Sequence, residues 1–309
     1  MFTVAVIGGS GLVGRALMET LNGRADWRVI GTAHRRARGA LEPLDIRNAT
    51  AIDAFVDRIA PNAVVIAAAE RRPDVCENDP ALARALNVDA VRAIALAGRR
   101  HDAWVLSIST DYVFDGTRPP YGVDDPPCPL NAYGRSKLDG EHALANATDF
   151  GCVLRLPLLF GPVTDLNESA VTSLVPAVIA SAKAGAPAAR MDAWATRYPT
   201  FTGDVAHVIR GMLERAASGA AVCGRTHWSG DEPMTKFDIA VRIARILGLD
   251  ARLEAVPASI DSTPRPRDCH LDASRLEALG IGRRTAFDDA LTHVLDHYLS
   301  RHPRDARGT

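Results

Sequence analysis

Two side chains in the middle of the sequence have the types and the spacing needed to move a proton. Tyr133 and Lys137 are four positions apart in a segment, 131–145, that we predict to be helical, so both would lie on one face. A tyrosine hydroxyl has a pKa of about 10 and is a poor acid near neutrality unless a nearby cation favours its phenolate. The ammonium group of Lys137 would supply that charge, and we interpret the two residues as a catalytic pair.

The scarcity of lysine makes this pair informative. The 36 basic side chains comprise 33 arginines and only Lys137, Lys183 and Lys236. With 5 tyrosines in the chain, chance would place about 0.05 tyrosines four residues before a lysine. A composition that favours arginine thus keeps Lys137 where a compact ammonium is needed and a planar guanidinium would not serve equally.

A third polar group follows an apolar run. Residues 103–108, a predicted strand, continue into Ser109, Thr110 and Asp111. Ligands bind at the carboxyl ends of strands in open α/β sheets. We predict that Thr110 holds a substrate carbonyl beside Tyr133, with Ser109 as the competing candidate and Asp111 also facing the substrate. The alternative is that these hydroxyl groups only bond to nearby backbone.

The first apolar run ends in a glycine-rich turn, Gly8-Gly9-Ser10-Gly11-Leu12-Val13-Gly14, that leads into a helical pattern. Backbone amides at a helix N-terminus bind the pyrophosphate of a dinucleotide, and a side chain at the closest glycine would block it. We expect a dinucleotide here, although a turn that only joins a strand to a helix is the alternative. Its expected contacts are Gly8, Ser10, Gly11, Leu12, Val13 and Gly14.

The end of the second apolar run indicates which dinucleotide. NAD-binding versions place an acidic residue there to accept from the ribose hydroxyls. This sequence has His34, Arg35 and Arg36, with Arg38 just beyond. Because arginine pairs with phosphate oxygens through two hydrogen bonds, these residues favour NADP(H), with its 2′-phosphate, over NAD(H). Solvated arginines in an arginine-rich chain are the alternative.

The elements that would position these groups alternate in type. Short apolar runs followed by longer helical patterns predict an α/β fold, a Rossmann-type doubly wound parallel sheet with helices on both faces. Strands are expected at 3–7, 27–33, 63–69, 103–108 and 152–156, and helices at 11–21, 50–60, 81–100 and 131–145. In the proline-rich second half, helices are expected at 171–184, 204–217, 235–247, 273–279 and 286–299.

The difference between the regularly alternating first half and the proline-rich second half predicts two lobes. Residues 1–170 would form the dinucleotide-binding domain, to which 196–224 would return. Residues 171–195 and 225–309 would form a smaller C-terminal substrate-binding α/β lobe.

Composition excludes several classes of function. With 36 basic and 37 acidic side chains and a net charge of −1, the chain has no overall field for nucleic acid or an anionic membrane. No apolar stretch reaches the roughly 18 residues of a membrane helix. The 5 cysteines form no Cys-x-x-Cys pair and the histidines have no ligand spacing, so we expect no metal and a reducing, cytoplasmic location.

The glycine turn, the Ser109-Thr110 strand end and the Tyr133-x-x-x-Lys137 pair together resemble the extended short-chain dehydrogenase/reductase family. Within it, residues 109–116 (Ser-Thr-Asp-Tyr-Val-Phe-Asp-Gly) and Arg265-Pro266 are similar to the dTDP-4-dehydrorhamnose reductases. That resemblance implies an NADPH-dependent reduction of a 4-keto sugar nucleotide.

A second resemblance is closer and extends over nearly the whole chain. Residues 68–75, 133–141, 227–230 and 279–282 are similar to the beta regulatory subunits of methionine adenosyltransferase. Those subunits are reductase-like proteins that bind NADP and attach to the catalytic subunit that makes S-adenosylmethionine. The resemblance therefore implies that catalytic subunit as a partner.

The resemblance also implies further contacts in the cleft. Asp45 and Ile46 would flank the adenine, Ala67, Ala68 and Ala69 would line the cofactor cleft with Asn87 close by, and residues 156–159, including Leu156 and Leu158, would pass the nicotinamide. Ser109, Tyr133 and Lys137 are expected beside the cofactor as well. The alternatives are ordinary strand core for 67–69 and a satisfied helix amide for Asn87.

Candidates for the substrate side are arginines and tryptophans. Arg197, Arg265 and Arg267 are the candidates to bind a nucleotide diphosphate, and Trp194 or Trp228 would stack on a base or sugar. Arg71, which follows a strand end, is a further candidate to face the substrate. In a chain with so many arginines, and with tryptophan most often in the core, solvent exposure and packing are the alternatives.

Two hypotheses for the function follow. The first is an NADPH-dependent reductase of a 4-keto-6-deoxy sugar nucleotide in which Tyr133 donates the proton. The second is a regulatory protein that binds NADP and a methionine adenosyltransferase, with little or no catalysis. A homodimer is a further hypothesis, for the assembly of the chain.

Overall fold

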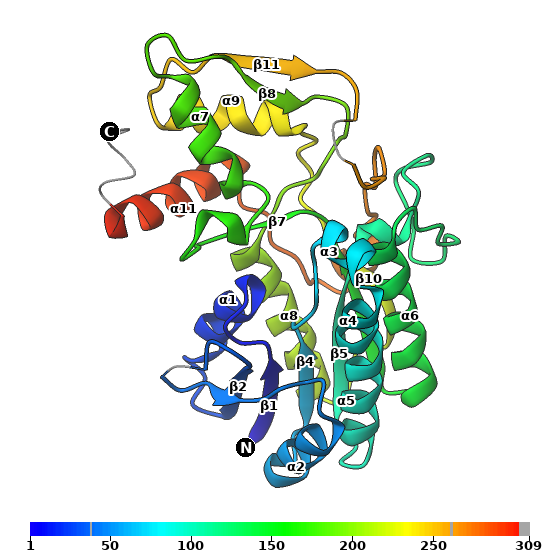
Figure 1. Ribbon diagram of the computed structural model, residues 1–309. Coiled ribbons are helices and arrows are strands. Elements are labelled where there is room, and N and C mark those ends of the chain that lie inside the picture. The colour runs from blue at the N-terminus through cyan, green and yellow to red at the C-terminus, as the bar shows by residue number, and fades with distance from the viewer. Residues whose placement is uncertain (38, 260–261, 303–309) are drawn as a thin grey trace.

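Seven parallel strands form the centre of the molecule (Figure 1). The structure is a computed structural model that describes residues 1–37, 39–259 and 262–302. The strands lie in the order β10-β6-β5-β4-β1-β2-β3. Their bounds are β1 (Phe2–Ile7), β2 (Trp27–Ala33), β3 (Glu42–Pro43), β4 (Ala63–Ile66), β5 (Trp104–Thr110), β6 (Gly151–Leu156) and β10 (Gly224–His227). The predicted doubly wound α/β fold is thereby confirmed.

Helices cover both faces of this sheet, which is why its strands are continuous apolar runs. On one face lie α1 (Leu12–Leu21) and α8 (Thr202–Ala217), which pack against each other. Residues Val13, Leu17 and Leu21 recur every four positions on α1 and form its buried face. The other face carries α2 (Ala49–Ile59), α5 (Ala90–Arg99) and α6 (Ala132–Ala147).

The predicted helix 81–100 is a composite. It follows α3 (Pro73–Asn78) and consists of α4 (Pro80–Arg84), one π-helical turn (Ala85–Asp89) and α5. Asp79 accepts a hydrogen bond from the backbone of Leu82 and so begins α4, as an Asp-Pro start predicts. The π turn widens the helix at Asn87, whose carbonyl lies so close to α6 that a Cβ at Gly140 would meet it at 2.1 Å.

A smaller lobe caps the carboxyl edge of the sheet (Figure 1). It contains α7 (Val175–Ser181), α9 (Lys236–Ile246), α11 (Phe287–Arg301) and the parallel strands β8 (Ala189–Asp192) and β11 (Leu253–Val256). These elements share one hydrophobic core. The short parallel pair β7 (Leu159–Phe160) and β9 (Thr200–Phe201) lies where the chain passes between the sheet and the lobe. The helix α10 (Ser274–Glu277) packs near β10.

Several predicted boundaries differ from the structure. The strand predicted at 63–69 ends at Ile66, so 67–69 form irregular backbone beyond it, whereas the strand predicted at 103–108 continues to Thr110. The helix predicted at 171–184 is a 3-10 turn (Thr172–Leu174) followed by α7. The apolar run at 63–69 extends past the end of β4, whereas β5 extends past its own apolar run, because backbone pairing rather than hydropathy decides where each strand ends.

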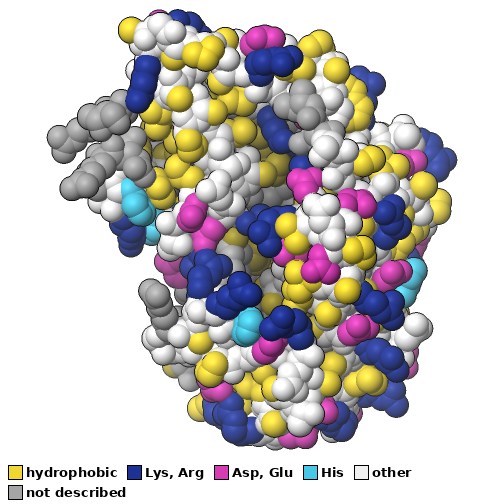
Figure 2. Space-filling view, in the orientation of Figure 1, with side chains coloured by type: hydrophobic (Ala, Val, Ile, Leu, Met, Phe, Trp, Pro, Cys, Tyr) yellow, Lys and Arg dark blue, Asp and Glu magenta, His cyan; other side chains and the backbone are white. Residues whose placement is uncertain are grey.

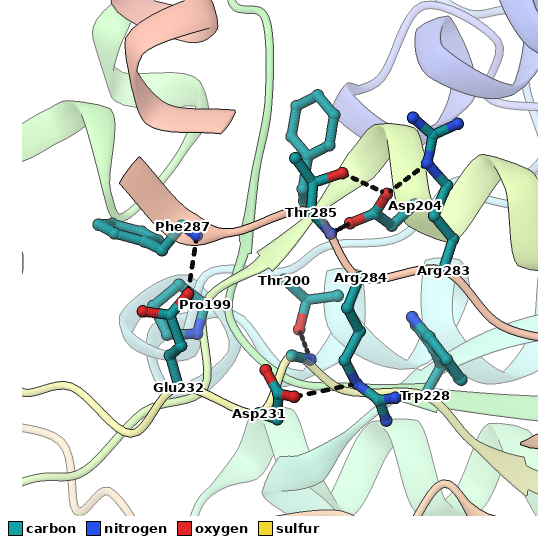
Figure 3. Close-up of a pocket in the computed structure, with 12 residues that line it drawn as sticks. Pro199, Thr200, Asp204, Trp228, Asp231, Glu232, Arg283, Arg284, Thr285 and Phe287 are labelled. Carbon is teal, nitrogen blue, oxygen red and sulfur yellow. Dashed lines mark hydrogen bonds and ion pairs between the residues drawn. The ribbon is translucent and has the colours of Figure 1, made fainter. Parts of the chain in front are cut away.

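Contacts around Asp204 fix α11 to the sheet domain (Figure 3). The buried carboxylate of Asp204 accepts hydrogen bonds from the backbone nitrogen and the hydroxyl of Thr285, at 2.7 and 2.8 Å, and pairs with Arg283 at 3.3 Å. The guanidinium of Arg284 lies 4.4 Å above the Trp228 ring. The cavity lined by these residues is about 10 Å³, which is room for about one water. We therefore assign this region a structural role, in which it connects α11 to the sheet domain.

Candidate functional site

A cavity of about 790 Å³ lies between the carboxyl edge of the sheet and the lobe. Ligand sites in proteins are typically about 300–1,000 Å³, so a dinucleotide-sized group fits. Figure 2 shows Lys and Arg side chains gathered around this hollow. The predicted site residues that line it are Gly8, Ser10, Gly11, Leu12, Val13, His34, Arg35, Arg36, Ala67, Ala68, Ala69, Arg71, Ser109, Thr110, Asp111, Tyr133, Lys137, Leu156, Leu158, Arg197 and Arg265.

The glycine turn has the geometry of a phosphate cradle. Gly8 has a φ of +93°, and a Cβ there would lie 2.8 Å from the backbone nitrogen of Ala68. Helix α1 begins after Gly11 with no side-chain cap and no acidic residue in its first turn. Its first N–H groups and its dipole therefore favour an anion at this point, which is what the pyrophosphate of a dinucleotide requires.

Gly14 should be intolerant of a side chain. A Cβ at Gly14 would lie 2.1 Å from the carbonyl oxygen of Gly8, so Gly14→Ala must displace the turn. We expect a loss of about 1–3 kcal/mol in the free energy of unfolding, despite the gain of about 1 kcal/mol in helix propensity, and weaker dinucleotide binding. Denaturant unfolding and calorimetric titration measure both. Gly23→Ala, where no atom lies within 4 Å, is the matched control and should change neither; equal effects would contradict the prediction.

Arginines follow the end of β2, where an NAD-binding protein would carry an acidic residue. Arg35 and Arg36 both line the cleft, and Arg36 forms an ion pair with Glu168 from the lobe side. His34 lies 3.6 Å from Asp45, which also pairs with Arg47 at 2.7 Å. Arg38 lies outside the described residues.

Tyr133 and Thr110 meet at the floor of the cleft. Asn131 caps α6 by accepting from the backbone nitrogen of Gly134 at 2.8 Å, which places Tyr133 in the first turn of that helix. Burial raises the pKa of the Tyr133 phenol, and a hydrogen bond with Thr110 opposes that shift. Thr110 in turn donates to Asp111 at 3.1 Å. The phenol is therefore protonated at neutral pH and lies beside the strand-end hydroxyl, and the lowering of its pKa by Lys137 that the sequence predicts does not outweigh burial.

Lys137 lies one turn further along α6 with its ammonium group buried. It is 5% exposed, and its Nζ donates to the carbonyl oxygen of Ile108 at 2.7 Å. Burial lowers the pKa of Lys137 to about 8, while the negative charge of Glu141 works in the opposite direction. The amine is mostly charged at neutral pH and is poised to lose its proton just above it.

Asp111 and Arg197 lie near each other in the lining of the same cleft. Burial raises the pKa of Asp111 to about 6, and the charge of Arg197 opposes this shift. The Arg197 guanidinium, 5% exposed, donates to the carbonyl of Pro266 at 3.0 Å and lies 5.7 Å from the Tyr112 ring. Arg265 hydrogen-bonds the Tyr112 hydroxyl and lies 3.7 Å from Asp74. Two arginines thus face the centre of the cleft from the lobe.

A buried ionic network supports this floor from behind. The Ser109 hydroxyl donates to Glu141 at 2.5 Å, and Arg155 binds both oxygens of Glu141 at 3.0 and 2.7 Å. Arg155 is fully buried and also lies 3.3 Å from His227, whose pKa burial lowers to about 4. Ser109, the competing candidate for the substrate carbonyl, therefore donates to the carboxylate of Glu141, just as Thr110 donates to that of Asp111.

Some predicted residues lie outside the lining of the cleft. Ile46 is buried in the core beside α2, and Asp45 is tied to Arg47. The side chain of Asn87 exchanges hydrogen bonds with the backbone of Glu70 and donates to Ser136, all at 2.9 Å. Gly14 packs under the turn, and Trp228 is a core residue beneath Arg284. Neither Trp194 nor Arg267 lines the cavity.

Other cleft residues were not predicted. Glu168, Asn167, Ser173, Tyr112 and Lys236 all line it. The scarcity of lysine was a signal for Lys236, since two of the three lysines face the cavity. Among the described residues, no cluster of three metal-binding side chains occurs. Within that same part of the chain, no helix is long and apolar enough to span a membrane.

A tyrosine, a lysine and a strand-end hydroxyl that meet beside a glycine turn on a parallel sheet place this molecule in the extended short-chain dehydrogenase/reductase class. Within that class, the chain belongs to the family described as the RmlD substrate binding domain, whose pattern matches residues 2–300. It is 42% identical over 298 residues to methionine adenosyltransferase 2 subunit beta of Pongo abelii, a match that covers 96% of this chain and 88% of that protein.

Solved structures of reductases share the fold. A dTDP-4-dehydrorhamnose reductase from Clostridium acetobutylicum superposes with a TM-score of 0.81 at 25% identity, covering 96% of this chain and 99% of that one. The corresponding enzyme from Bacillus anthracis, solved in complex with NADP, gives 0.82 at 23% identity and covers 96% and 98%. The resemblance to the extended short-chain dehydrogenase/reductases is confirmed.

Proposed function

We propose that the chain is an NADPH-dependent reductase of a 4-keto-6-deoxy sugar nucleotide. The observation that carries this proposal is the Tyr133 phenol, kept protonated by burial and bonded to Thr110 in a cleft of about 790 Å³. The arginines that follow β2 support a 2′-phosphorylated dinucleotide, and the Bacillus anthracis relative was solved with NADP. A nucleotide diphosphate suits the lobe side because Arg197 and Arg265 face the cavity.

Each of these cleft residues has a separate role in the proposed reaction. Bound NADPH would supply a hydride to the keto carbon. The Thr110 hydroxyl orients the keto oxygen toward Tyr133, which gives that oxygen its phenolic proton, so the carbonyl becomes an alcohol. The ammonium group of Lys137, one turn further along α6, would stabilise the phenolate that remains. The glycine turn and the start of α1 hold the pyrophosphate.

NADPH oxidation with a panel of 4-keto-6-deoxy sugar nucleotides tests the reductase. We expect turnover with at least one member of the panel, and a stronger preference for NADPH than for NADH. Absence of turnover with every member would overturn the proposal.

Lys137 should set the alkaline side of the pH profile. Because its buried amine has a pKa of about 8, the ammonium is present below that pH and is lost as the pH rises through it. We expect kcat for reduction to fall above about pH 8 with loss of one proton. In Lys137→Arg the guanidinium stays charged, so its remaining activity should show no such decrease between pH 7 and 10. The same decrease in both proteins would assign it to another group.

A regulatory function is the second proposal, and the 42% identity to methionine adenosyltransferase 2 subunit beta favours it. In this case the dinucleotide would stabilise the fold and the chain would bind a methionine adenosyltransferase. Size-exclusion chromatography of the two purified proteins from one organism is the test. Co-elution as a complex would support the regulator, and separate elution at micromolar concentration would contradict it.

A further inference from the structure

One carboxylate faces the end of the cleft where the sequence predicts a phosphate. Glu168 ends a short 3-10 turn in a segment that we call the strap, residues Thr164–Ser169. Its side chain is 13% exposed and lines the cavity. Burial alone would raise the pKa of Glu168, but Arg15 and Arg36 outweigh it and hold the pKa below its ordinary value. Glu168 is therefore charged throughout the neutral range.

The two arginines that bind Glu168 are held very differently. Arg15, on α1, donates to Glu168 at 2.6 Å, to the Ser10 carbonyl at 2.8 Å and to the Pro162 carbonyl at 3.1 Å, so it is fixed among three acceptors. Arg36 follows β2, is 55% exposed and forms an ion pair with Glu168. The Arg36 end of this pair is open to solvent although Glu168 is largely buried, so another anion can reach the guanidinium and replace the carboxylate as its partner.

The strap remains tied without Arg36. Besides the contact with Arg15, Glu168 accepts from the backbone nitrogen of Thr164 at 3.2 Å, and Arg71 donates to the carbonyl of Asn167 at 3.4 Å. The Arg36 contact is thus not needed to hold the segment in place, and its release would leave the Glu168 carboxylate beside Arg15.

We propose that Glu168 is a specificity-determining residue that competes with the 2′-phosphate of the dinucleotide for Arg36. The inference depends on the proposed NADP binding. A phosphate monoester carries about −1.5 to −2 charges and pairs with arginine through two hydrogen bonds, so it displaces a carboxylate from that guanidinium. NAD, which has a hydroxyl at this position, does not displace it. Glu168 therefore weakens NADP binding by competition and repulsion while leaving NAD binding nearly unchanged.

Glu168→Gln separates these effects because it keeps the shape of the side chain and removes its charge. Isothermal titration calorimetry with NADP+ and NAD+ gives the two dissociation constants without any turnover. We expect NADP+ to bind about 3–10-fold more tightly at low salt and NAD+ to change less than about twofold. The difference should shrink at high ionic strength because salt screens exposed charges.

Two variants control the experiment. Asp165→Asn removes the same charge from the same strap, but its carboxylate bonds within the strap, to Asn167, and should leave the NADP+ to NAD+ ratio unchanged. In an Arg36→Gln background, Glu168→Gln should lose most of its effect on NADP+. Equal shifts for both dinucleotides, or an equal effect of Asp165→Asn, would overturn the inference alone. A wild-type protein that binds neither dinucleotide would overturn the proposed cofactor as well.

Discussion

Tyr133→Phe is expected to lower kcat for the reduction by about 10²–10⁴-fold, the usual contribution of a positioned acid. The substitution removes only the phenolic oxygen, which hydrogen-bonds Thr110 and is the proton donor of the proposed reaction. The aromatic ring keeps its edge contact with Tyr112, at 5.9 Å between centroids, so α6 should keep its position. Stopped-flow and steady-state measurements of NADPH oxidation give the loss in kcat.

A binding control separates chemistry from folding. The dissociation constant of NADP+ for Tyr133→Phe should stay within about threefold of wild type, since one hydrogen bond is the most that is lost. Tyr112→Phe, which removes a hydroxyl from the neighbouring ring, is the matched control and should keep kcat within about tenfold. Full activity of Tyr133→Phe would show that another group donates the proton.

The first half of the fold was predictable because its signals are local. Buried parallel strands are apolar on both faces, so runs such as 3–7 and 27–33 are visible in the sequence and match β1 and β2 closely. Strands of two to four residues, such as β7 and β9, have no such pattern. Their pairing depends on where the lobe meets the sheet, which is tertiary information.

Parts of the candidate site could likewise be predicted from local sequence, and other parts could not. Tyr133 and Lys137 are joined by helical spacing, and the glycine turn by its own sequence, so both could be found without the structure. Arg36 and Glu168 are 132 positions apart, and nothing in either neighbourhood indicates the other. Asn87 is the opposite case. It was expected to lie close to the cofactor, but in the structure its side-chain amide hydrogen-bonds Glu70 and Ser136.

The buried ionic network of Ser109, Glu141 and Arg155 could not be predicted from the sequence either. Glu141 and Arg155 are ordinary charged residues until the register of β5 and β6 places Ser109 opposite Arg155 and α6 covers both. Their burial makes the pair expensive to break, because a charge left alone in the interior has no water to solvate it.

Glu141→Gln should therefore lower the free energy of unfolding by at least about 3 kcal/mol. The reason is Arg155, fully buried and left without its counter-charge. Denaturant unfolding measures the loss. Asp53→Asn breaks an exposed pair with Arg100, which has a similar N–O distance of 2.9 Å, and is expected to cost less than about 1 kcal/mol. Equal losses in the two variants would contradict the role assigned to burial.

The double variant Glu141→Gln/Arg155→Met separates stability from the electrostatics of the site. The double variant leaves no uncompensated charge in the interior, so most of the lost stability should return. The support that Glu141 gives to the charge of Lys137 does not return, and the pKa of that amine should fall below about 8. Since reduction requires the ammonium, the decrease in kcat should begin at a lower pH than in wild type even though the protein is again stable. An unchanged pH profile in the double variant would mean that Glu141 serves only as the counter-charge of Arg155 and does not affect Lys137.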